Sequence, residues 1–202
     1  MVLERQRLDP SCLNPAPRLP FNLRVDDVTL AVQDVYDFFY DVNHFLFDRS
    51  LPRLDDTLRS AILSGVISDM LTESIAKHSR SLTPNRFHNG HPDLLVNGKY
   101  PGNSVKSGIE GVEIKTTQKK GGAVDLHGAR DQWMMVFVYE VDRETEPAFD
   151  RAPLKFTEIY VAKVVADDFR KNNRGELGTR TATLDRAGLR ILRDGWIYLD
   201  QS

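Results

Sequence analysis

The chain has 202 residues, 41% of them hydrophobic and 28% charged, a composition that is ordinary for a globular domain and excludes a disordered or fibrous protein. Its net charge of −2 excludes a protein that holds nucleic acid by non-specific charge alone, so any DNA contact must come from a local basic surface. The single cysteine, Cys12, excludes an internal disulfide, and no apolar run reaches the ~20 residues that cross a bilayer. We therefore expect a cytoplasmic protein with no membrane partner.

The N-terminal half of the chain is predicted to be an arm followed by two helices. Residues 1–28 contain four prolines, which disfavour a helix and predict an extended arm that either wraps over the domain or reaches a partner. Residues 29–202 are expected to form one domain. Apolar residues at three- and four-residue steps predict a helix from Thr29 to about Asp48. Asp55 or Asp56 can cap a second helix that runs to about His78.

The C-terminal half is predicted to be rich in strands. Asp93–Val96 is a short strand that the turn signal Asn97-Gly98 ends, and residues 111–117 alternate as a strand does. The further expected elements are a short helix at about 126–132, strands at 134–141 and 156–165, a helical turn at 167–172, a short helix at 184–193 and a strand at 196–199. This order predicts a mixed α/β (α+β) domain with a central sheet.

Asp93, Glu113 and Lys115 form the pattern that carries chemistry. Asp93 opens one predicted strand, and Glu113 and Lys115 lie two apart on another. Residues two apart in a strand point to the same face, so Glu113 and Lys115 project together while Ile114 points into the core. If the two strands pair as a hairpin, Asp93 reaches the same place, and its carboxylate should lie within about 6 Å of that of Glu113.

Each of these residues has an ordinary structural interpretation when it is taken singly. An aspartate after a proline is commonly a turn or cap residue, and an acid and a lysine two apart commonly form a solvent-facing pair on an edge strand. As a set they suit phosphodiester cleavage. Two carboxylates are hard ligands for Mg²⁺, the metal activates a water, and a lysine beside them orients that water or stabilises the transition state.

The pattern Pro92-Asp93, nineteen intervening residues, then Glu113-Ile114-Lys115 resembles the PD-(D/E)XK nuclease superfamily, which includes most type II restriction enzymes. The resemblance covers about residues 55–165 and implies a restriction-endonuclease-like fold, a central mixed β-sheet flanked by helices. It implies that Asp93, Glu113 and the main-chain carbonyl of Ile114 bind Mg²⁺, for which Mn²⁺ can substitute. Many members add an acid from the preceding helix. Glu73 fits that role, with Asp69 as the substitute, although an exposed helical glutamate is the default interpretation.

Several basic residues after this pattern are candidates for DNA contact. Lys119 and Lys120, followed by Gly121-Gly122, can hold a phosphate by charge and by free main-chain N–H groups, or they form a solvated hairpin tip. His127 and Arg130 face the scissile phosphate or the groove, or they cap a helix. A C-terminal basic run follows the DNA backbone or is an ordinary charged surface: Arg170, Lys171, Arg174, Arg180, Arg186, Arg190 and Arg193.

His88 and His91 faintly suggest a histidine metal site. We reject it because no cysteine pair or downstream histidine pair completes a zinc site. The leading hypothesis is a Mg²⁺-dependent DNA endonuclease of restriction type that acts on double-stranded DNA as a homodimer. The alternatives are a structure-specific nuclease of repair or recombination, and a nuclease-like fold that only binds nucleic acid or a protein.

Overall fold

The structure is a computed structural model that describes residues 3–126, 128–172 and 181–200. Within these ranges the α-helices are α1 (Val25–Phe47), α2 (Leu54–Thr57), α3 (Ser60–His78) and α4 (Arg186–Asp194). The strands are β1 (Leu82–Pro84), β2 (Leu94–Val96), β3 (Gly111–Thr117), β4 (Asp125–Leu126), β5 (Gln132–Glu140), β6 (Lys155–Val164), β7 (Phe169–Asn172), β8 (Thr181–Leu184) and β9 (Trp196–Leu199). No helix in the described ranges is long and apolar enough to span a membrane.

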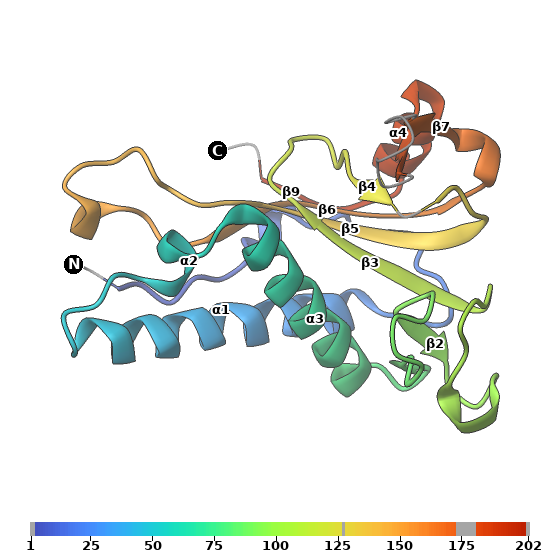
Figure 1. The fold of residues 1–202 in the computed structure, drawn as a ribbon, viewed down its shortest axis with the longest axis horizontal. Coiled ribbons are helices and arrows are strands. Elements are labelled where there is room, and N and C mark those ends of the chain that lie inside the picture. The colour runs from blue at the N-terminus through green and yellow to red at the C-terminus, as the bar shows by residue number, and fades with distance from the viewer. Residues whose placement is uncertain (1–2, 127, 173–180, 201–202) are drawn as a thin grey trace.

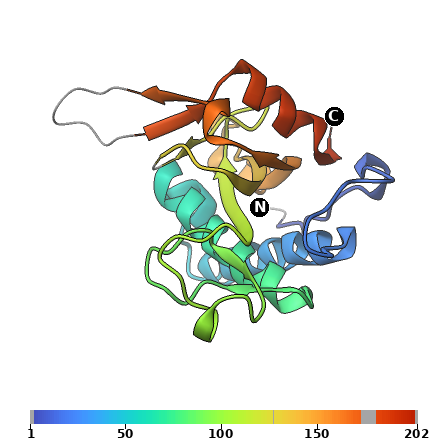
Figure 2. The same ribbon diagram turned by 90° about the vertical axis from the view of Figure 1, so that its right-hand side faces the viewer.

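A six-stranded sheet separates two helical layers. Its strand order is β1-β2-β3-β5-β6-β9, and a small sheet has the order β4-β8-β7. Only β3 and β5 pair in parallel; every other pair in the main sheet is antiparallel. Helices α1 and α3 lie on one side of the main sheet, and α4 and the small sheet lie on the other (Figure 1). Figure 2 shows β7 and β8 side by side, extending from the body of the molecule. The expected mixed α/β domain, with a central mixed sheet flanked by helices, is confirmed.

The central strand β5 is buried on both faces, which explains why its sequence is a nearly continuous apolar run. Met135 and Phe137 pack into the core beneath α1 and α3. Met134 and Val136 point the other way, into a second core that Leu192 of α4 helps to close. In the parallel pairing of β3 with β5, Glu113 lies beside Met134 and Lys115 lies beside Val136. Glu113 and Lys115 therefore lie on the α4 side of the sheet.

The two predicted N-terminal helices form with different bounds. Helix α1 begins at Val25, four residues before the predicted start, because the Asp27 carboxylate accepts the main-chain N–H of Arg24 and closes its first turn. The second predicted helix is two helices, since the chain is extended at Leu58 and at the following arginine. Asp55 does not cap α3: it is fully buried and binds Asn43 and Arg53.

Two predicted elements differ in the structure, and two short strands were not predicted. No described residue between 126 and 132 is helical: Leu126 belongs to β4, where it pairs with Ala182, and Gln132 begins β5. The predicted turn at 167–172 is a 3₁₀ turn, Ala166–Asp168, followed by strand β7. Strand β8 precedes α4 and was not predicted, and neither was the three-residue strand β1. These short elements exist because a partner strand pairs with them.

The N-terminal arm packs on the domain. The main-chain N–H of Asn14 donates to the carbonyl of Ile197 at 2.8 Å, and Leu13 forms a β-bridge with Tyr198 of β9. Leu8 and Leu19 pack against the core beneath α1 and α3. Of the two alternatives for the arm, these contacts match the one in which it wraps over the domain.

Candidate metal centre

The pairing of β2 with β3 brings Asp93 and Glu113 together. The two strands are antiparallel, with Leu94 opposite Val112, so the next position along the ladder places Asp93 opposite Glu113. One ligand atom from each carboxylate, with a third from His91, lies within 4.8 Å of the others. The expected separation of less than about 6 Å is confirmed, and with it the hairpin on which it depended.

Lys115 lies between the two carboxylates. Its Nζ is 2.6 Å from Glu113 Oε1 and 3.9 Å from Asp93 Oδ2. Burial disfavours the charged ammonium, yet the negative charges of Glu113 and Asp93 outweigh burial and hold the pKa of Lys115 above its ordinary value. The lysine is therefore a permanent cation, held where two acids converge.

Asp93 carries a negative charge that its surroundings disfavour. Burial and the neighbouring charge of Glu113 raise the pKa of Asp93 to about 6, against the opposing effects of Lys115 and of the Ile114 N–H. One lysine thus leaves the two acids with an excess of negative charge. Two carboxylates and an imidazole are donors that suit a divalent cation, which would remove that excess.

Ile114 contacts both sides of the site through its main chain. Its N–H donates to Asp93 Oδ2 at 2.8 Å, and its carbonyl accepts a hydrogen bond from Ser68 Oγ of α3 at 3.3 Å. The side chain is fully buried in the core, as the alternation of β3 predicts. A carbonyl oxygen has a second lone pair, so this contact with Ser68 leaves the Ile114 oxygen able to bind a metal.

The helix acids share a hollow with Asp93 and with no other member of the acid–acid–lysine group. Glu73 and Asp69 are exposed on α3, and both line a hollow that Asp93 also lines. Among the residues that the structure describes, the close ligand group contains His91, Asp93 and Glu113 and neither helix acid. The structure thus brings Glu73 to the same hollow as Asp93, but not into the group of closest donors.

His91 is the site residue that sequence reasoning missed. Its Nδ1 is 3.3 Å from Glu113 Oε2, and its side chain is part-buried. The sequence lacks a complete zinc set, and the signal for this histidine is local. His91 stands two positions before Asp93 in one short segment, which brings its ring to the same carboxylate.

The candidate DNA contacts are dispersed. The positive charge of Arg130 opposes the rise in the pKa of Lys115. Lys119 is exposed, and Lys120 Nζ pairs with Glu140 at 3.3 Å. His127 lies outside the described residues.

The idea that free main-chain N–H groups at Gly121-Gly122 hold a phosphate is wrong. The Gly121 N–H donates to Glu158 Oε2 at 2.7 Å, and the Gly122 N–H donates to the Lys119 carbonyl at 3.3 Å. Both groups are therefore engaged within the protein. The carboxylate of Glu158 also repels an anion at this place.

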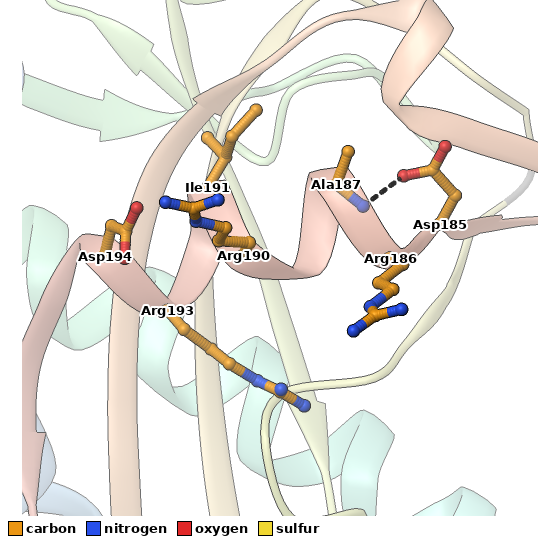
Figure 3. Close-up of a pocket in the computed structure, with 7 residues that line it drawn as sticks. All are labelled: Asp185, Arg186, Ala187, Arg190, Ile191, Arg193 and Asp194. Atoms are coloured by element: carbon orange, nitrogen blue, oxygen red, sulfur yellow. Dashed lines mark hydrogen bonds between the residues drawn. The ribbon is translucent and has the colours of Figure 1, made fainter.

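The C-terminal basic residues gather in part on α4. Figure 3 shows Arg186, Arg190 and Arg193 around a hollow that Asp185 and Asp194 also line. Arg193 Nε donates to the Gly121 carbonyl at 3.0 Å, so this arginine fastens α4 to the loop after β3. The other members of the run are Arg170, which is exposed on β7, Lys171, whose side chain is not described, and Arg174 and Arg180, which lie outside the described residues.

No protein-family model matches the chain, and no curated protein matches it in sequence. Any functional inference therefore rests on the geometry and chemistry of these side chains.

Proposed function

We propose that the protein is a Mg²⁺-dependent DNA endonuclease that hydrolyses phosphodiester bonds in double-stranded DNA, as a type II restriction enzyme does. The observation that supports this most strongly is the position of Lys115, 2.6 Å from Glu113 and 3.9 Å from Asp93. A fixed cation beside two acids that can hold a metal suits the cleavage of an anionic ester. The same three residues underlie the resemblance to the PD-(D/E)XK superfamily.

Each residue has a distinct task in this proposal. Asp93, Glu113 and the Ile114 carbonyl hold the metal, and Mn²⁺ substitutes for Mg²⁺. When bound, the metal supplies an activated water and offsets charge on the phosphate. Lys115 keeps its proton, because its pKa is raised, and directs that positive charge at the oxygens of the reacting phosphate. Glu73 extends the ligand set from the rim of the hollow.

The DNA is held by positive charge around this centre. Arg130 is one of the proposed contacts, and its positive charge acts on the pKa of Lys115. Lys119, Lys120 and His127, which follow β3 in the sequence, are the further proposed DNA contacts. Cleavage of both strands requires two active sites or two visits, so we propose a homodimer acting in the cytoplasm.

The test compares an unmethylated plasmid, a methylated plasmid and a four-way junction, each with Mg²⁺ and with EDTA. We expect Mg²⁺-dependent cleavage of the unmethylated plasmid by the wild type and by Glu110→Gln, and none by Glu113→Gln. Glu110 is a matched control, since it lies three residues away and its side chain is 39% exposed. Cleavage of the junction alone would identify a structure-specific nuclease. DNA binding without cleavage of any substrate would show that the proposed activity is wrong.

A further inference from the structure

We propose that His91 is a ligand of the metal, and that its imidazole gives the site a preference for first-row transition ions such as Mn²⁺ and Co²⁺ over Mg²⁺. This inference rests on the proposed metal site, because it adds a nitrogen donor to the oxygen donors of Asp93 and Glu113. The three residues each offer one donor atom, and those atoms lie within 4.8 Å of one another.

The two carboxylate oxygens of Glu113 have different neighbours. Oε1 is 2.6 Å from Lys115 Nζ, and Oε2 faces His91 Nδ1 at 3.3 Å. Because the lysine holds one oxygen and the side chain is only 2% exposed, the carboxylate cannot turn toward solvent to find a cation. A cation that binds Glu113 at Oε2 therefore arrives next to the imidazole.

The 3.3 Å distance suits two ligands of one ion better than it suits a strong hydrogen bond. A hydrogen bond between an imidazolium and a carboxylate is typically ~2.7–2.9 Å long. Adjacent ligands of an octahedral ion bound at ~2.1 Å lie ~3.0 Å apart, and opposite ligands lie ~4.2 Å apart. The His91–Glu113 pair is close to the first value, and the full 4.8 Å span of the group needs only side-chain adjustment to reach the second.

The main chain of His91 is held on both sides, which positions the ring. Its N–H donates to the Lys106 carbonyl at 3.1 Å, and its carbonyl accepts from the Gly108 N–H at 2.7 Å. The side chain is 26% exposed, so its imidazole is accessible without being free in solvent. A ligand held in this way loses little conformational freedom when a metal binds.

A nitrogen ligand changes which metals bind best. Mg²⁺ prefers oxygen donors and keeps several of its waters, whereas imidazole favours transition ions, whose affinities rise from Mn²⁺ to Co²⁺. Replacing a water by His91 therefore stabilises bound Co²⁺ and Mn²⁺ more than bound Mg²⁺. Loss of this imidazole should reduce that selectivity.

The test is electron paramagnetic resonance of Mn²⁺ bound to the full chain without DNA, with Co²⁺ and Mg²⁺ affinities obtained by competition. We expect a ¹⁴N coupling from one directly bound nitrogen in the wild type, replaced by a ¹⁵N coupling when the histidines are ¹⁵N-labelled. His91→Gln should lose the coupling and bind Mn²⁺ and Co²⁺ at least ~10-fold more weakly, with Mg²⁺ affinity changed by less than about threefold. His88→Gln, an exposed histidine three positions earlier, is the matched control and should behave as the wild type.

The outcomes separate this inference from the proposed function. Mn²⁺ binding that depends on Asp93 and Glu113, but shows no nitrogen coupling and is unchanged in His91→Gln, would overturn the role of His91 and leave the metal site intact. Absence of Mn²⁺ binding by the wild type would overturn both. The isotope measurement uses the wild-type sequence, so its result does not depend on whether a variant folds.

Discussion

Replacing Asp93 by asparagine should stabilise the metal-free protein while it removes metal binding. The carboxylate of Asp93 is buried beside Glu113, and its pKa is raised from 3.8 to about 6. Asparagine keeps an oxygen that accepts the Ile114 N–H, and it has no charge to bury. The substitution therefore removes an unfavourable charge and retains the hydrogen bond.

The size of the effect follows from the two pKa values. One pKa unit corresponds to ~1.4 kcal/mol, so the rise from 3.8 to about 6 means that ionised Asp93 destabilises the folded state by at most ~3 kcal/mol. The side chain is 28% exposed, and solvent screening lowers the expected gain to about 1–2 kcal/mol. The folded carboxyl binds its proton more tightly than the unfolded one does. The effect of Asp93 on the free energy of unfolding is therefore most favourable below pH 4, and this advantage is lost as the pH rises through 6.

The assay is urea denaturation in EDTA at pH 8 and pH 4.5, with Asp167→Asn, a change at an exposed acid, as the control. The free energy of unfolding of Asp93→Asn should exceed that of the wild type by about 1–2 kcal/mol at pH 8, and the difference should be smaller at pH 4.5. Adding a divalent metal should stabilise the wild type and leave Asp93→Asn unchanged, because only the wild type gains a bound ion. An Asp93→Asn protein that is less stable than the wild type at pH 8 in EDTA would refute this view of the site's charge.

Three further predictions concern activity. Lys115→Ala should lower the cleavage rate roughly 10²–10³-fold and keep DNA binding, because a cation beside the transition state is lost. Single-turnover cleavage rates measure the effect, and an unchanged rate would show that Lys115 does not stabilise the transition state. Ca²⁺ should support DNA binding without cleavage. It is larger than Mg²⁺ and has looser coordination, so it screens the charge of the acids but does not place the water for attack. A gel-shift assay and a cleavage assay, both with Ca²⁺, check this, and rapid cleavage would contradict it. Glu73→Gln should need more Mg²⁺ for half-maximal rate, and superimposable Mg²⁺ titrations would place Glu73 outside the site and direct attention to Asp69.

The strands that carry the site could be predicted because their signals are local. Glu113 and Lys115 lie two apart in a strand whose bounds, 111–117, match the sequence pattern, and a turn signal follows Asp93–Val96. Pairing of these two segments as a hairpin then places Asp93 opposite Glu113. Period-two alternation predicts that Glu113 and Lys115 share a face, and the position of Asp93 follows once the two strands are assumed to pair.

The elements that could not be predicted depend on distant partners. Leu126 was assigned to a helix, but it lies in a strand because Ala182 pairs with it. Asp55 resembles a helix cap in the sequence, yet Asn43 and Arg53 enclose it in the core. The pairing of Leu126 with Ala182 joins segments far apart in the chain, and the burial of Asp55 depends on how α1 packs on α2, so local sequence patterns indicate neither.

The role of His91 escaped prediction for a different reason. His91 stands two residues before Asp93, but the sequence holds no second histidine or cysteine pair that would complete a zinc set with it. The contact with Glu113 depends on the β2–β3 pairing and on main-chain bonds from residues 106 and 108. Mixed sets of histidine and carboxylate along one hairpin deserve the same search as cysteine pairs.

We propose that Asp93, Glu113 and Lys115 form one metal-dependent centre that cleaves DNA. This is tested most directly by cleavage of a mixture of genomic and branched DNA, with Mg²⁺, by the wild type and by Glu113→Gln, a change that removes one charge and preserves size. We predict new DNA ends with the wild type, none with EDTA, and none with Glu113→Gln at equal protein concentration. Equal numbers of ends from the two proteins, or no ends from the wild type, would contradict the claim.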